Sequence, residues 1–81
     1  MVMVPYVNLN GTAREELIQQ QMTALMTIKA AIEALNQANP HGRDYKTMED
    51  YRVAREEQFQ RAAKLFDIKE EIENVIYALM E

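Results

Sequence analysis

The chain has 81 residues, no cysteine and a net charge of -4. This length allows one domain at most, and the absence of cysteine excludes a disulfide framework and a cysteine metal site. The acidic balance argues against general nucleic-acid binding, which depends on basic surface. No stretch approaches the roughly 18 uncharged apolar residues of a membrane-spanning helix, so we expect no membrane partner. The lack of cysteine fits a reducing compartment, so a cytoplasmic location is expected.

Residues 1–11 predict an extended arm. Pro5 forbids a helix through this segment and disfavours a central strand. Val2, Val4 and Tyr6 make the segment too apolar for a free tail. We therefore expect the arm to pack on the helices or on a neighbouring subunit.

A first helix is predicted over residues 13–38. Thr12 and Glu15 have the spacing of a capping box, in which Thr12 accepts a hydrogen bond from the Glu15 amide. Ile18, Leu25 and Ile32 then repeat every seven residues and define an apolar face. The helix ends before Pro40, because the residue that precedes a proline leaves the helical region.

A second helix is predicted over residues 46–80, after a loop at 39–45. Thr47 is the expected cap, with Asp50 at the third position after it. One apolar row repeats every seven residues, and it consists of Tyr51, Gln58, Leu65, Ile72 and Leu79.

The short loop predicts an antiparallel two-helix hairpin, so the fold class is all-α and residues 1–81 form a single helical domain. A lone hairpin of this size buries too little to fold firmly, so we expect a homo-oligomer, a dimer or higher, in the form of a helical bundle. The predicted contacts place Leu35 near Tyr51, Leu25 near Gln58 and Arg61, and Ile18 near Ile68.

Each predicted helix has a second row with the same spacing, residues 21, 28 and 35 in the first helix and residues 54, 61, 68 and 75 in the second. Polar residues interrupt the apolar rows at Gln21, Gln58 and Arg61. A buried arginine without a partner is strongly destabilising. These positions therefore either line a polar cavity or lie at the edge of the helix interface with their polar ends in solvent. The second interpretation is the simpler one.

Cations gather near the loop. Residues 41–64 carry six Lys or Arg against five acidic residues, whereas residues 65–81 carry five acidic residues against Lys69 alone. Arg52 and Arg55 share a helix face, and together with Arg43 and the helix N-terminus they could clamp a phosphate. The alternative is that neighbouring carboxylates occupy them in ordinary surface ion pairs.

The loop also holds His41, Gly42 and Asp44. With one histidine and no cysteine, the chain predicts no metal site, and no bound cofactor is expected. His41 and Asp44 have no evident nucleophile beside them, so we expect a protein that is not an enzyme.

Two further groups could contact a ligand. Tyr45 and Tyr51 could stack on a base, or they could close the loop end of the core. Asn10, Gly11 and Thr12 present amides near a helix N-terminus, which favours an anion. These amides lie far from the loop in one hairpin, but the two ends can meet in an antiparallel dimer.

Three segments resemble small helical proteins encoded in phages and prophages. They are Leu9-Asn10-Gly11-Thr12 followed by Leu17, Pro40-His41-Gly42-Arg43-Asp44-Tyr45, and residues 54–57. Small helical oligomers of that setting include sponges that sequester nucleotide second messengers of host immunity, such as cyclic dinucleotides and cyclic ADP-ribose derivatives. The resemblance implies an anti-defence role in the host cytoplasm through architecture and setting alone.

These observations predict a non-enzymatic protein that captures a small phosphorylated nucleotide between subunits. Arginines 43, 52 and 55 would hold phosphates, tyrosines 45 and 51 would stack a base, residues 10–12 would donate amides, and His41 and Asp44 would contact ribose or base edges. The alternative is a structural or interaction protein whose helical bundle binds a host or phage protein, with the loop as a simple turn.

Overall fold

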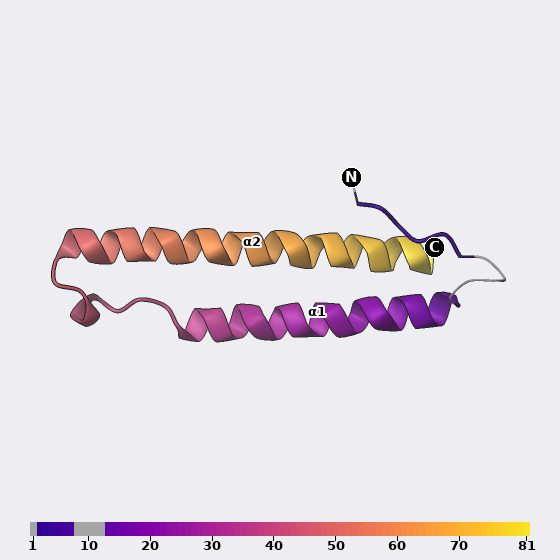
Figure 1. Ribbon diagram of the computed structural model, residues 1–81, viewed down its shortest axis with the longest axis horizontal. Coiled ribbons are helices and arrows are strands. Elements are labelled where there is room, and N and C mark those ends of the chain that lie inside the picture. Colours follow the sequence, from indigo (N-terminus) through magenta and orange to yellow (C-terminus); the bar gives the residue numbers. More distant parts are fainter. Residues whose placement is uncertain (1, 8–12) are drawn as a thin grey trace.

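The structure is a computed structural model that describes residues 2–7 and 13–81. Two long helices, α1 (Arg14–Gln37) and α2 (Met48–Met80), are joined through a short 3-10 helix, η1 (Gly42–Asp44). No strand occurs in this part of the chain, which confirms the predicted all-α class. The helices pack against each other, and the chain runs in opposite directions along them (Figure 1).

Helix α1 starts one residue later and ends one residue earlier than predicted. Its N-cap is Ala13, which has extended backbone angles (φ -61°, ψ 150°) and no side-chain cap. The capping prediction placed the cap at Thr12, which lies outside the described residues. At the other end, the Ala38 amide bonds to the Leu35 carbonyl, which tightens the last turn before Pro40.

Helix α2 starts at Met48, two residues after the predicted start. The predicted cap is confirmed, because the Thr47 hydroxyl oxygen accepts a hydrogen bond from the Asp50 amide at 3.0 Å. The negative charges of Glu49 and Asp50 in the first turn also interact favourably with the positive end of the helix dipole. The helix then continues without interruption to Met80, as predicted.

The core between the helices is thin. Its buried apolar residues are Leu25, Ile32, Val75, Ile76 and Leu79. Large apolar side chains are exposed along both helices, and they include Met22, Met26, Met48, Val53, Phe59, Phe66, Ile68, Tyr77 and Met80. The molecule is 61 Å long but only 22 by 17 Å across, so most side chains lie on its surface.

The predicted register between the helices is wrong. The Gln58 side-chain nitrogen donates to the Leu35 carbonyl at 2.8 Å, so Leu35 faces Gln58 and not Tyr51. The shift is about two helical turns. Counting an equal number of residues along both helices from this contact places Ile18 near Val75 and Ile76, not near Ile68.

The connection between the helices explains this shift. Residues 38–47 contain η1 and extended stretches, so they form a longer link than a tight turn. As a result, the first turns of α2 project beyond the end of α1 and lie over the link (Figure 1).

Residues 2–7 have no regular secondary structure, as expected for an arm, and they lie at the same end of the molecule as the C-terminus (Figure 1). Val2 and Val7 are half-buried, whereas Met3 and Tyr6 are exposed. Neither helix contains an apolar stretch of the length and purity that a membrane crossing requires.

Candidate functional site

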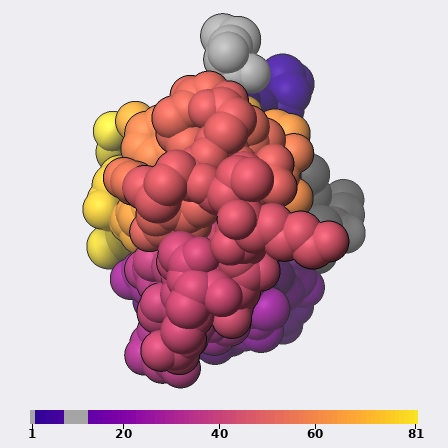
Figure 2. All heavy atoms as spheres, turned by 90° about the vertical axis from the view of Figure 1, so that its left-hand side faces the viewer, coloured from indigo at the N-terminus to yellow at the C-terminus, as the bar shows by residue number. Residues whose placement is uncertain are grey.

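A groove lies where α2 projects past the end of α1. Its volume is about 800 Å³, which is within the range of small-molecule sites. Figure 2 views the molecule from this end. The groove is lined by Asn36, Asn39, Pro40, Tyr51, Arg52, Arg55, Glu56, Gln58, Phe59 and Ala62.

Two tyrosines and one arginine form a cluster at the groove, from which Tyr51 and Arg55 line it. The ring centroids of Tyr45 and Tyr51 are 6.1 Å apart with the planes tilted by 42°. The guanidinium carbon of Arg55 lies 5.6 Å from the Tyr51 ring centroid, within the range of a cation–π interaction. One face of Tyr51 therefore already has a cation beside it.

The loop backbone approaches the same ring. A methyl group at Gly42 would lie 3.8 Å from the Tyr51 ring, which is ordinary contact distance. Gly42 does not have positive φ, so this position does not require glycine for its backbone angles. Tyr51 is half-buried, with Gly42, Tyr45 and Arg55 around it.

Arg52 is paired within its own helix. Its Nη2 and Nε atoms donate to the Glu49 carboxylate at 2.6 and 3.1 Å. This hydrogen bond raises the pKa of Arg52 above its ordinary value. Of the two interpretations of this side chain, the surface ion pair describes its geometry, and an incoming phosphate would have to compete with Glu49.

Arg43 and Arg55 differ from Arg52 in this respect. Within residues 2–7 and 13–81, neither guanidinium forms an ion pair with a carboxylate. Arg55 lines the groove, whereas Arg43 belongs to η1 and is not among the lining residues. Arg55 is thus the cation of this site with the most capacity for a new partner.

Gln58 is buried and its amide contacts α1, so the simpler prediction, which placed it at the edge of the helix interface with its amide in solvent, is wrong. It is 8% exposed, and besides its bond to Leu35 it accepts a hydrogen bond from the exposed Arg61 at 3.2 Å. Both ends of the amide therefore have partners. Its position in the apolar row, where an aliphatic residue is expected, was the sequence signal of this role.

The structure brings together only part of the predicted site. Tyr51, Arg52 and Arg55 line the groove, and Tyr45 contacts Tyr51. His41, Gly42, Arg43 and Asp44 are exposed and do not line it.

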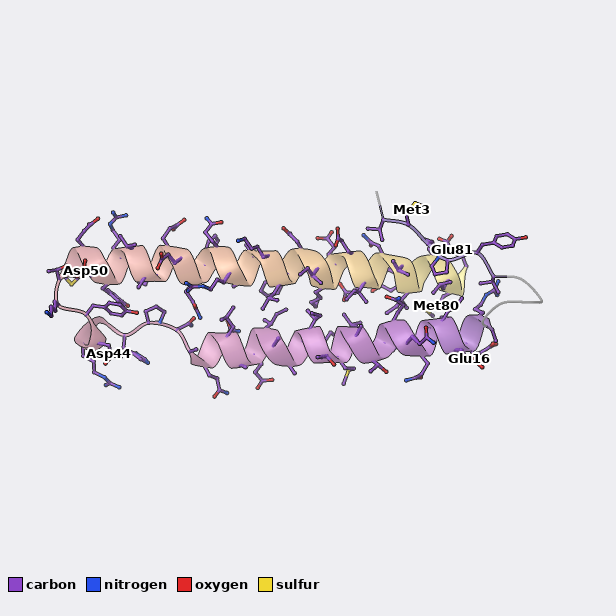
Figure 3. All side chains as sticks on the ribbon, viewed as in Figure 1. Met3, Glu16, Asp44, Asp50, Met80 and Glu81 are labelled. Carbon is purple, nitrogen blue, oxygen red and sulfur yellow. The ribbon has the colours of Figure 1, made fainter. Side chains whose placement is uncertain are left out.

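The predicted amide donors Asn10, Gly11 and Thr12 lie outside the described residues. The start of α1 lies at the opposite end of the molecule from η1, as Glu16 and Asp44 show in Figure 3. The described start of α1 therefore does not meet the loop within one chain.

Several lining residues were not predicted. Phe59 and Ala62 follow Arg55 at spacings of four and seven along α2, so helical periodicity alone could have placed them on this side. Asn36 and Asn39 depend on the position of α1 beside α2, which the predicted register placed incorrectly.

Polar, charged and aromatic side chains all line the groove. Its ionisable members are Tyr51, Arg52, Arg55 and Glu56. Among the described residues, no group of three His, Cys, Asp or Glu side chains is arranged to hold a metal ion.

Protein-family models, curated proteins and solved structures include no significant match to this chain.

Proposed function

We propose that this chain is a non-enzymatic interaction protein, and that it functions as a homo-oligomeric bundle of antiparallel helical hairpins. The observation that carries the proposal is the imbalance between the thin core and the large apolar side chains that remain exposed along the helices. Large apolar side chains that recur along the exposed side of a helix suit packing against another helix.

Size supports the same proposal. A chain of 81 residues without cysteine relies on its apolar core, and that core contains five buried apolar residues in the described part of the chain. Small helical proteins commonly add the missing burial by association. Association through α1 and α2 would cover side chains such as Met26, Phe59 and Phe66.

Sedimentation equilibrium at micromolar concentration tests this proposal. We expect a discrete oligomer whose mass is an integral multiple of 9.4 kDa. Circular dichroism on the same samples should show high helicity. A stable and fully helical monomer at these concentrations would contradict the proposal.

A second candidate function is the capture of a small phosphorylated nucleotide, the role that the resemblance to phage-encoded proteins implies. The observation that favours it is Arg55, which lines a ligand-sized groove beside Tyr51. A planar base on the aromatic residues and a phosphate on Arg55 would suit these groups.

A thermal-shift screen against cyclic dinucleotides, cyclic ADP-ribose isomers and common nucleotides tests this candidate. A ligand at 100 times its dissociation constant adds about 2.7 kcal/mol of stability. The shift should disappear in Arg55→Ala and persist in Lys64→Ala, which removes an exposed charge that does not line the groove. No shift with any of these compounds would argue against nucleotide capture.

A further inference from the structure

One side of α2 has a symmetric pattern of exposed apolar residues. Met48, Phe59, Phe66 and Tyr77 are each more than half exposed. Their spacings are eleven, seven and eleven residues, which correspond to about three, two and three helical turns, so the four side chains follow one line along the helix. The midpoint of this line falls between Ala62 and Ala63.

The charged residues on the same side obey the same symmetry with opposite signs. Arg52 and Arg55 lie between Met48 and Phe59, whereas Glu70 and Glu73 lie between Phe66 and Tyr77. Arg52 is as far from the midpoint as Glu73, and Arg55 is as far from it as Glu70. We call these apolar, alanine and charged residues the outer stripe of α2.

We propose that a second copy of this chain packs its α2 antiparallel on the outer stripe, about a two-fold axis between Ala62 and Ala63. The proposal rests on the proposed function, and it specifies which surface mediates the association. In this arrangement Phe59 packs on Phe66 of the second copy, and Arg55 pairs with its Glu70. Each contact occurs twice because the interface is isologous.

The small residues at the midpoint favour this arrangement. Two helices approach most closely where the side chains at their contact are small. Ala62 and Ala63 lie at the proposed axis, and Phe59 and Phe66 follow one helical turn away on either side. The aromatic rings would therefore close over the sides of a narrow central contact.

Charge determines the direction of the second helix. In a parallel pair with the same residues in register, Arg55 would face Arg55 and Glu70 would face Glu70, and like charges at such positions are unfavourable. The antiparallel pair replaces both repulsions with attraction. Arg55 is the informative residue, since neither it nor Glu70 forms an ion pair within the described residues.

Arg52 and Glu73, the two charged residues of the outer stripe that lie farther from the proposed axis, already have partners within their own helix. Arg52 is bound to Glu49, and Glu73 accepts from Lys69 at 3.2 Å. We therefore expect Arg55 and Glu70 to contribute more to specificity than Arg52 and Glu73 do.

This arrangement also identifies an occupant for the groove. Arg52, Arg55, Phe59 and Ala62 belong both to the groove and to the outer stripe. The segment of the second copy from Ala63 to Glu73 would lie over them. The anion that the arginine cluster predicts would then be a carboxylate of a second copy.

Charge reversal and its rescue test this interface. Arg55→Glu and Glu70→Arg should each weaken self-association by about tenfold or more in sedimentation equilibrium, because each places like charges opposite one another twice. The double variant Arg55→Glu/Glu70→Arg should restore association. Lys64→Glu, a charge reversal away from the outer stripe, should change it by less than about twofold.

A cysteine pair tests the direction without altering the charges. Met48→Cys and Tyr77→Cys lie opposite each other in the antiparallel arrangement, and the chain has no other cysteine. Under mild oxidation, a mixture of the two variants should form the mixed disulfide much faster than either variant forms its own. Preferential self-crosslinking of Met48→Cys would indicate a parallel pair and overturn the proposal.

The remaining outcomes also discriminate. A folded wild-type monomer would contradict both this interface and the proposed function. If the single charge reversals leave self-association unchanged, or if the double variant does not restore it, the proposed interface is wrong while the proposed function stands. A cyclic dinucleotide could instead stabilise the wild-type oligomer without dissociating it, and fail to stabilise Arg55→Ala. This result would assign the groove to a nucleotide and would show that the second copy does not occupy it.

Discussion

At the residue scale, Gln58 shows how one polar side chain can align two helices. It lies in an otherwise apolar row, yet it is buried because its amide bonds to Leu35 of α1 and to Arg61. The Leu35 carbonyl also accepts the Ala38 amide, so Gln58 adds a second partner to a carbonyl at the end of a helix. A buried amide with both ends bonded favours one register over its neighbours.

We predict that Gln58→Ala lowers the free energy of unfolding by about 1 to 3 kcal/mol, through loss of the hydrogen bond and of packed volume. Gln58→Met keeps most of the side-chain volume, so we expect a smaller loss of stability, and this loss should report the contribution of the hydrogen bond. Urea unfolding followed by circular dichroism at one fixed concentration measures both.

The matched control is Gln60→Ala, which removes an exposed amide that bonds to Glu56 of its own helix. It should change stability by less than about 0.5 kcal/mol. Equal effects of Gln58→Ala and Gln60→Ala would show that the contact with Leu35 contributes nothing specific.

At the element scale, α2 depends on its N-terminal cap. The first turns of α2 extend beyond α1, so they have fewer packing partners than the rest of the helix (Figure 1). The bond from Thr47 to the Asp50 amide and the acidic residues of the first turn therefore carry much of the local stability.

We predict that Thr47→Ala lowers the free energy of unfolding by about 1 kcal/mol, because it removes the cap. Thr27→Ala makes the same chemical change inside α1, where the hydroxyl bonds back to the Thr23 carbonyl. Thr27→Ala should raise the free energy of unfolding slightly, by about a few tenths of a kcal/mol, since alanine is the better helix former. Thermal unfolding of the two variants should thus shift in opposite directions, and a shared sign would contradict the capping role.

At the scale of the whole molecule, the long and narrow shape leaves little interior. Two helices side by side have one shared face, so apolar residues on the other faces of the helices are exposed in the single chain. The outer stripe of α2 is one such surface.

We predict that the thermal midpoint rises with protein concentration, by roughly 3 to 6 °C per tenfold increase for a dimer of this size. Calorimetry over a hundredfold range of concentration measures this dependence. A constant midpoint across that range would indicate that each chain folds on its own.

Much of the local structure follows from the sequence. The helix formers, the seven-residue repeats and the Thr47–Asp50 spacing predicted both helices to within two residues at each end, because these signals act within a few residues of one another. Tyr51, Arg52 and Arg55 could likewise be placed together, since they share one side of a single helix.

Only the tertiary structure decided the register between the two helices, that is, which residues of α1 lie opposite which residues of α2. The register depends on the path of residues 38–47 and on the reach of Gln58 to Leu35, and neither follows from periodicity. The register in turn placed Asn36 and Asn39 beside Arg55 and left His41 and Arg43 outside the groove. Contacts within a helix are set by its fixed geometry, whereas contacts between helices depend on how the intervening chain folds and on which side chains can satisfy one another across the gap.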